Sequence, residues 1–214
     1  MKTIPSAVRT ILKEDETARE AARRGILNNS AYAREILNRV ENETWKDVEE
    51  SSISVAINRV TQDTSFQPVK PKLVFDRISV ETGLVDVTYE NTLQVIEALN
   101  NTIPKLRATF AQDLYLETNG QRQITMVMTK SMWDEVIKIV TIKPIGLYSN
   151  QVALTIAFDD RYLKIPNFIY AVIGLFAIEY INIIEIFSTM TEIVVVMSES
   201  DLDTALRQVK KLLQ

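Results

Sequence analysis

The chain has 214 residues, of which 46% are hydrophobic, enough to bury the core of one or two domains. It carries 24 Lys and Arg against 28 Asp and Glu, and this net charge of −4 gives the whole chain no attraction for nucleic acid or an anionic membrane. It contains no Cys and no His, which excludes thiol and imidazole catalysis, disulfides and the metal sites built from those ligands.

The sequence contains no constellation of residues typical of an enzyme. Its five glycines are too scattered to form a phosphate-binding loop or a dinucleotide fingerprint. Carboxylates are plentiful, but no arrangement of them supports catalysis. We therefore expect a non-enzymatic protein without a metal or another cofactor.

The apolar segments of the sequence are too short to form a membrane-spanning helix. The longest apolar run, residues 168–178, falls well short of the ~20 residues that a bilayer-spanning helix needs. Charged residues occur too near the start of the sequence to leave room for the apolar core of a signal peptide. We therefore expect a cytoplasmic protein with no membrane partner.

Residues 1–62 are predicted to form an all-helical domain. Apolar residues recur at helical spacing, as at Ile53, Ile57 and Val60. The proportions are typical of a helix-turn-helix or winged-helix module with residues 51–62 as the recognition helix. The candidate base-reading residues are Ser52, Ser54, Asn58, Arg59 and Gln62, and the candidate phosphate contacts are Arg23, Arg24 and Lys46.

The charge of this domain argues against DNA as its partner. Residues 1–64 hold 10 basic and 11 acidic side chains, and the acidic residues 47–50 directly precede the candidate recognition helix. A helical protein-interaction module is therefore an equal alternative. Pro68 and Pro71 then interrupt the helical pattern, and residues 63–72 are predicted to be a linker.

An internal repeat with an offset of 69 residues follows the linker. LVDVTYEN, from Leu84, aligns with ALTIAFDD, from Ala153, and ITMVMTKSMWDEVIKIV, from Ile124, aligns with IVVVMSESDLDTALRQV, from Ile193. Two separated segments in one register indicate a duplicated unit. We place the copies at residues 73–149 and 150–214.

Each copy is predicted to run strand, helix, strand, strand, helix. In the second copy, residues 152–158 form a strand, Pro166 opens the helix, and residues 181–187 and 193–197 form a hairpin. A closing strand completes the split βαβ motif, which predicts an α+β fold of tandem ferredoxin-like βαββαβ units. Residues 142–148 close the first copy. The second copy lacks such a strand, and residues 73–80 are predicted to supply it by crossing over.

The C-terminal residues resemble the regulatory ACT domain at the end of aspartokinases. The most specific part is INIIEIFSTMTEIVVVM, residues 181–197, followed by the acidic helix start ESDLDTAL. The resemblance implies regulation by a small molecule, usually an amino acid, bound where two ACT units pack together. No kinase domain precedes these units. The combination with an N-terminal helical domain resembles uncharacterised archaeal proteins, whose function it does not supply.

The resemblance also implies a set of ligand-binding residues. In the family, the effector lies against the loop after the first strand, the start of the first helix and the facing strands of the partner unit. Here these positions are Asp159, Asp160, Arg161, Tyr162, Leu163, Lys164, Ile165, Pro166 and Asn167 in the loop, and Phe187, Ser188 and Thr189 in the strand. The helix start favours a carboxylate, and Asp159 or Asp160 can accept an ammonium group. A solvated loop and a plain hairpin turn are the alternative interpretation.

Two functional hypotheses follow from these features. In the first, the chain is a homodimeric regulator that senses an amino acid through its ACT units and acts on DNA, as a transcriptional regulator, through its helical domain. In the second, the ACT units bind no ligand and form a dimerisation platform for an N-terminal protein-interaction module.

Overall fold

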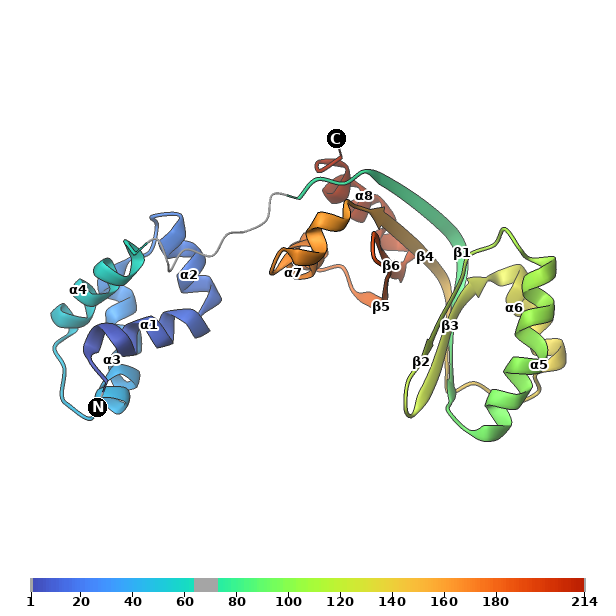
Figure 1. The fold of residues 1–214 in the computed structure, drawn as a ribbon, viewed down its shortest axis with the longest axis horizontal. Helices are drawn as coiled ribbons and strands as arrows, with labels where there is room; N and C mark the ends of the chain where they lie inside the picture. The colour runs from blue at the N-terminus through green and yellow to red at the C-terminus, as the bar shows by residue number, and fades with distance from the viewer. Residues whose placement is uncertain (1, 64–72, 214) are drawn as a thin grey trace. The chain divides into compact units, whose positions relative to one another are not determined.

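The structure, a computed structural model, describes residues 2–63 and 73–213 (Figure 1). Its contacts divide the chain into two compact units, Met1–Val69 and Lys70–Gln214. The described part of the first unit is helical, and the second unit combines helices with a sheet, which confirms the predicted α+β fold class. Apart from Asp63, the predicted linker of residues 63–72 lies outside the described residues.

The described part of the N-terminal unit consists of helices α1 (Ile4–Glu14), α2 (Glu16–Arg23), α3 (Asn29–Thr44) and α4 (Glu50–Thr61). Three of these helices begin at a side chain that accepts a hydrogen bond from the backbone three residues later, namely Thr3, Asp15 and Asn28. Helix α1 packs against both α3 and α4. The core between them contains Ile53, Ile57 and Val60, the inward positions that the helical spacing predicts.

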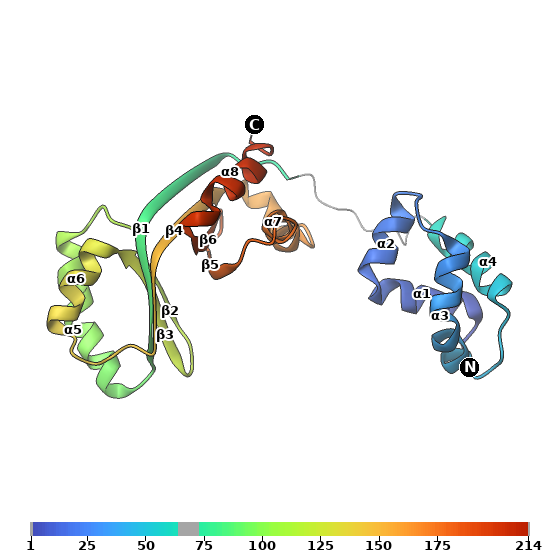
Figure 2. The same ribbon diagram turned by 180° about the vertical axis from the view of Figure 1, so that it is seen from behind.

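The second unit is built on one six-stranded antiparallel sheet (Figure 2). Its strands are β1 (Arg77–Glu90), β2 (Tyr115–Asn119), β3 (Gln123–Thr129), β4 (Gly146–Ala157), β5 (Ile183–Ser188) and β6 (Glu192–Ser198). They lie in the order β2-β3-β1-β4-β6-β5. Each half of the sheet is a four-stranded ferredoxin-like unit, because β1 and β4 are long enough to belong to both halves.

Strand β1 crosses from the second repeat into the first. Its residues 84–90 pair with β3, inside the first repeat. Its residues 77–81 pair with residues 153–157 of β4 and so provide the fourth strand of the second repeat. The crossover predicted for residues 73–80 is therefore confirmed, although the strand begins at Arg77.

The sheet has two long strands where four shorter ones were predicted. Residues 77–80 of the first predicted strand and the strand that starts at Leu84 are both part of β1, and residues 146–148 and 152–157 of the next two predicted strands merge into β4. Gly83 (φ 68°) and Asn150 (φ 57°) adopt left-handed conformations near the point where each strand changes repeat. The pairing register of β1 with β4 shifts there, a bulge that bends the strands without ending them. The predicted boundary between residues 149 and 150 therefore falls inside β4.

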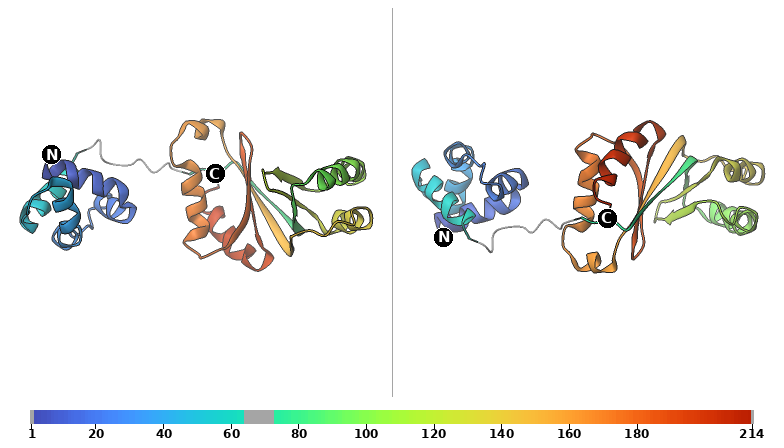
Figure 3. Two further views of the ribbon diagram at one scale, coloured as in Figure 1. Left: turned by 90° about the horizontal axis from the view of Figure 1, so that it is seen from below. Right: turned by 90° about the horizontal axis from the view of Figure 1, so that it is seen from above.

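Four helices cover one face of this sheet. Helices α5 (Leu93–Thr109) and α6 (Lys130–Ile139) pack on the first half, against Val87 and Tyr89 among others. Helices α7 (Phe168–Ala177) and α8 (Leu202–Lys210) pack on the second half, against Leu154 and Ile156 among others. Figure 3 shows the two helix pairs on opposite outer sides of the curled sheet.

The alternate residues of the strands form the other face of the sheet, here called the inner face. Leu84, Val127 and Val196 lie on it and are almost fully buried, although the helices described above pack on the opposite face. They belong to one apolar cluster drawn from both repeats. The curl of the sheet therefore closes the inner faces of the two repeats against each other, and it also buries the carboxylate of Asp86 (2% exposed).

Candidate functional site

The connection between β4 and α7 is long and locally structured. Residues Asp160–Lys164 form a 3-10 helix, which Asp159 caps by accepting a hydrogen bond from the Arg161 backbone N–H (2.9 Å). The chain then turns at Asn167, whose φ of 65° is left-handed, and α7 begins at Phe168. Pro166 therefore does not open the helix as predicted, because the left-handed turn at Asn167 separates the proline from the first helical residue.

Three aromatic rings hold this connection against the sheet. The ring of Phe168 lies 4.7 Å from that of Phe158 and 4.6 Å from that of Tyr162, measured between centroids, and all three residues are buried. The Val74 backbone N–H donates a hydrogen bond to the Tyr162 hydroxyl oxygen (3.1 Å), which fixes this ring from the side of the crossover strand. Such aromatic contacts contribute about 0.5–1.5 kcal/mol each beyond their buried area. The loop is therefore anchored by its apolar residues, while its charged residues remain outside.

The turn between β5 and β6 lies beside the same loop. The Thr189 backbone N–H donates to the Glu192 carbonyl oxygen (2.9 Å) within this turn, and the Phe158 backbone N–H donates to the Thr191 carbonyl oxygen (2.9 Å). The second bond joins the end of β4 directly to the hairpin turn. Loop, helix start and hairpin turn therefore meet at one place.

A cavity of about 260 Å³ lies at this meeting point. Its lining residues are Phe158, Tyr162, Leu163, Ile165, Asn167, Phe168, Ile169, Tyr170, Ser188, Thr189 and Ile193. The volume is slightly below the ≈300–1,000 Å³ typical of sites for drug-sized ligands, so the cavity suits a single small molecule. Its walls are mainly apolar and aromatic, with a few polar groups.

The predicted ligand-binding residues divide into two groups around this cavity. Six of them line it, namely Tyr162, Leu163, Ile165, Asn167, Ser188 and Thr189. The other six do not, namely Asp159, Asp160, Arg161, Lys164, Pro166 and Phe187. Phe187 packs instead against the apolar cluster of the inner face, because its side chain points to the opposite side of β5.

The remaining lining residues were not predicted. Phe168, Ile169 and Tyr170 form the first turn of α7, while Phe158 and Ile193 come from the ends of β4 and β6. Their apolar character suits a core as well as a cavity, so the sequence gives no local signal for a binding role. Only the placement of the strand ends next to the helix start brings them together.

The charged residues of the loop are exposed and interact with one another. The Arg161 guanidinium lies 3.6 Å from the Asp159 carboxylate and 5.6 Å from the centroid of the Tyr162 ring, outside the cavity. The predicted ammonium acceptors Asp159 and Asp160 are therefore not part of the cavity wall. The polar side chains of the wall are instead Asn167, Ser188 and Thr189, together with the tyrosines Tyr162 and Tyr170.

A second polar cluster lies on the inner face of the sheet. Burial raises the pKa of Asp86 to about 6, and the nearby Glu185 carboxylate contributes to this shift. Burial also raises the pKa of Glu185. The Asp86 Oδ2 and Gln151 Oε1 atoms are buried without a hydrogen-bond partner within the described part of the chain. Unpaired buried acceptors destabilise a fold, and protonation of a carboxyl group is the direct way to relieve this cost.

The candidate DNA-binding residues of the N-terminal unit are only partly accessible for that role. Ser52, Asn58 and Arg59 are exposed on α4 and Gln62 is exposed directly after it, as predicted from the helical spacing, whereas Ser54 is half-buried. Arg24 and Lys46 are also exposed. Arg23, in contrast, donates two hydrogen bonds to the Glu20 carboxylate (2.8 and 2.7 Å). This ion pair neutralises one of the three predicted phosphate contacts.

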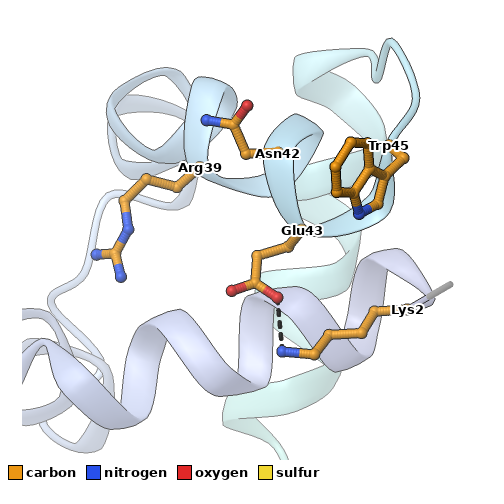
Figure 4. A pocket seen from close by; sticks show the side chains of 5 residues that line it. All are labelled: Lys2, Arg39, Asn42, Glu43 and Trp45. Carbon is orange, nitrogen blue, oxygen red and sulfur yellow. Dashed lines mark hydrogen bonds and ion pairs between the residues drawn. The ribbon is translucent and has the colours of Figure 1, made fainter.

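Other cations of this unit are paired as well. Figure 4 shows a shallow hollow lined by Lys2, Arg39, Asn42, Glu43 and Trp45. The Lys2 ammonium lies 2.5 Å from the Glu43 carboxylate, and the Arg39 guanidinium lies 2.6 Å from the Glu14 carboxylate. Trp45 beside them is 83% exposed and adopts a left-handed conformation (φ 57°). The hollow thus presents an aromatic ring and balanced charges rather than a basic surface.

Among the described residues, no group of three or more Asp and Glu side chains is arranged to hold a metal ion. Within the same residues, no helix is both long enough and apolar enough to cross a membrane.

Comparison with known proteins identifies the fold of the second unit. No protein-family model and no curated protein matches the sequence. The chain is similar to the ligand-free regulatory subunit of aspartate kinase from Thermus thermophilus, with a TM-score of 0.51 and 11% identity over 66% of this chain and 99% of that one. It is also similar to aspartate kinase from Clostridium acetobutylicum, with a TM-score of 0.50 and 12% identity over 68% of this chain. The similarity spans 37% of the length of that kinase. At these identities the similarity shows the fold, which is ACT-like.

Proposed function

We propose that this chain is a non-enzymatic regulatory protein that senses an amino acid in the cavity of its second ACT-like repeat. The observation that carries this proposal is the cavity itself, formed where the loop before α7 meets the turn between β5 and β6. Loop, helix start and hairpin each contribute lining residues, so a ligand in the cavity contacts all three. Its binding is therefore coupled to the relative positions of these elements.

The start of α7 is suited to a carboxylate. The backbone N–H groups of Phe168 and Ile169 have no partner within the helix, and Asn167 provides no side-chain cap at this helix start. A bound carboxylate would accept hydrogen bonds from these groups and interact favourably with the helix dipole. Ser188 and Thr189 on the other side of the cavity are then available to an ammonium group through their oxygen atoms.

The outer surface of the second repeat supports a homodimer. Ile169 and Tyr170 on α7 and Ile178 directly after it are exposed, and Ile186 on the neighbouring edge strand β5 is 43% exposed. An unpaired strand edge beside an apolar helix favours pairing with another sheet, and two copies related by a twofold axis present the same surface to each other. The cavity opens next to this surface, because Ile169 and Tyr170 belong to both.

The N-terminal unit is the proposed output module. Its ion pairs and exposed Trp45 favour a protein partner, whereas the exposed Ser52, Asn58, Arg59 and Gln62 are the residues with which a transcriptional regulator would read DNA. Aromatic residues are enriched in the centres of protein interfaces, and tryptophan above all dominates their energetics. The alternative function is accordingly a ligand-free dimerisation platform with an N-terminal protein-interaction module.

A thermal-shift screen of the full chain against the twenty amino acids tests the sensing function. A ligand that binds the folded state raises its melting temperature by mass action. We expect at least one amino acid to do so at millimolar concentration. If none does, the sensing function is wrong and the dimerisation platform is favoured.

A matched pair of variants tests whether the ligand binds in this cavity. Ile169→Glu puts a negative charge at the rim of the cavity, on a side chain that is 55% exposed and therefore not needed for the core. Leu93→Glu makes the same change at the start of the corresponding helix of the first repeat, where the side chain is 71% exposed. We expect Ile169→Glu to abolish the ligand-induced shift and Leu93→Glu to retain it. Equal loss in both variants would place the ligand elsewhere.

A further inference from the structure

The lining of the cavity also bears on the chemical class of ligand. Leu163, Ile165, Ile169 and Ile193 form its aliphatic surface, and the rings of Phe158, Tyr162 and Phe168 form its aromatic surface. The three aromatic residues and Ile193 are each at most 4% exposed, so this part of the wall is held rigidly by the core. Apolar ligand atoms that enter the cavity therefore leave water without any rearrangement of the protein.

Charged side chains are absent from the described lining of the cavity. Asp159, Asp160, Arg161 and Lys164 all lie in the neighbouring loop but face solvent. A ligand side chain with an ammonium, guanidinium or carboxylate group would lose its hydration inside the cavity and gain no opposite charge there. Such a group is expensive to bury without a partner.

The polar groups of the cavity wall come from two of the elements that meet there. Asn167 and the uncapped first turn of α7 come from one side, and Ser188 and Thr189 come from the hairpin on the other. These groups suit the α-carboxylate and α-ammonium groups that all amino acids share. The apolar remainder of the wall then surrounds the part of the ligand that differs between amino acids.

We infer that the ligand is an amino acid with an uncharged, apolar side chain, of the size of leucine, isoleucine, methionine or phenylalanine. The inference rests on the proposed sensing function, since it names the class of ligand for the same cavity. Lysine, arginine, aspartate and glutamate are excluded by their side-chain charge. The cavity volume of about 260 Å³ limits the ligand to one such molecule.

Calorimetric titration of the full chain with individual amino acids tests this selectivity. We expect leucine, isoleucine, methionine or phenylalanine to bind at least tenfold more tightly than lysine or glutamate. Leucinamide and 4-methylpentanoate, which lack the carboxylate and the ammonium group respectively, are expected to bind at least tenfold more weakly than leucine. Tighter binding of a charged amino acid would overturn the inference but leave the sensing function in place. If no amino acid binds at all, both are wrong.

A variant that introduces a charge into the cavity wall also tests the preference for an uncharged side chain. Leu163→Lys places an ammonium group at the rim, on a residue that is 53% exposed. We expect it to weaken binding of the apolar amino acid at least tenfold and to improve binding of glutamate relative to it. Leu93→Lys, at a residue of the first repeat that is 71% exposed and lies outside both the lining and the proposed dimer surface, is the matched control and should leave both affinities unchanged. An unchanged preference in Leu163→Lys would contradict the inference.

Discussion

The first repeat joins its opening strand to its helix through Asn91 and Thr92 alone, whereas the second repeat uses residues 158–167. In the first repeat, the Thr92 hydroxyl oxygen accepts a hydrogen bond from the Val95 backbone N–H (3.3 Å) and so caps α5. In the second repeat, Asn167 leaves the start of α7 uncapped beside a cavity. The first copy therefore closes its helix start with its own side chain, whereas the start of α7 in the second copy lacks such a cap.

Exposed apolar side chains occur on the helices of both repeats, so they do not distinguish the two copies. Leu93 on α5 and Ile137 on α6 are exposed in the first repeat, as Ile169 and Tyr170 on α7 are in the second. The repeats differ instead at the start of the first helix, where the second repeat has a cavity. The contrast teaches that two copies of one fold can keep the same strands and helices while the connection between them changes.

The largest expected effect concerns the strand that the two repeats share. Deleting residues 1–82 removes Phe75, which is fully buried, and the residues 77–81 that close the sheet of the second repeat. Removing one large buried side chain costs about 3–5 kcal/mol, so we expect the whole deletion to cost more than about 5 kcal/mol and to unfold that repeat. Urea unfolding followed by circular dichroism measures it.

A shorter deletion provides the control for this experiment. Removing residues 1–64 leaves β1 and all of its pairing intact, so the second unit is expected to stay folded. If both deletions unfold at the same urea concentration, the shared strand does not hold the second repeat together.

The contact between the inner faces of the two repeats predicts a pH dependence. The pKa of Asp86 is raised from 3.8 to about 6 in the folded state, so the native state binds this proton more tightly than the unfolded chain. The stability that Asp86 contributes is therefore present below about pH 4 and lost as the pH rises through 6. At pH 7 we expect Asp86→Asn to stabilise the protein by about 2 kcal/mol and to remove this part of the pH dependence.

Unfolding by urea at several pH values between 4 and 7 checks this prediction, with the wild-type chain measured in parallel. Glu185→Gln serves as a second variant, since removing this neighbouring charge should lower the pKa of Asp86 and weaken the pH dependence. A constant difference between wild type and Asp86→Asn across this range would show that Asp86 stays ionised in the folded state.

The two edge strands of the sheet are expected to differ in their importance for self-association. Ile186→Lys places a charge on β5, the exposed edge of the second repeat, and is expected to weaken self-association at least tenfold, or about 1.4 kcal/mol. Thr118→Lys makes the same change on β2, the opposite edge of the sheet, and should have no effect. Sedimentation equilibrium distinguishes the outcomes. A strictly monomeric wild-type chain, or equal effects of the two variants, would contradict a dimer formed through the second repeat.

The smallest expected effect concerns the two bends in the shared strands. Gly83→Ala adds a methyl group that meets no atom within 4 Å, so its cost of about 1 kcal/mol reflects only the left-handed backbone (φ 68°). Asn150→Gly at the corresponding bend of β4 is expected to change stability by a few tenths of a kcal/mol at most, because asparagine already tolerates this conformation. Thermal unfolding measures both. A cost well above 1 kcal/mol for Gly83→Ala would mean that the bend also depends on packing.

Much of the fold was predictable because the sequence contains an internal repeat and regularly spaced apolar residues. The shared register of the repeat around Leu84 and Ala153, and the missing closing strand of the second copy, together predicted the crossover of β1. The burial of Asp86 was not predictable, because an aspartate on an alternating strand normally faces water and only the curl of the sheet encloses it. The start of α7 was misplaced for a similar reason. Pro166 is a common first-turn residue, but the left-handed turn at Asn167 depends on how Phe168 packs against Phe158.

Six of the twelve residues predicted through the resemblance to ACT domains line the cavity, because the resemblance supplies the position of the loop. The resemblance does not say which loop side chains face inward. Burial of the Tyr162 ring turns Asp160, Arg161 and Lys164 outward, and this outcome depends on packing that is not visible in the sequence.

The stoichiometry of amino-acid binding tests the central comparison most directly. Isothermal titration of the full chain with the amino acid that gives the largest thermal shift counts the sites in each chain. Since Thr92 caps the helix start of the first repeat, whereas the start of α7 lies without a side-chain cap beside a cavity, we predict one molecule per chain, lost in Ile169→Glu and retained in Leu93→Glu. Two molecules per chain, with one lost in each variant, would show that both repeats bind and would contradict the account.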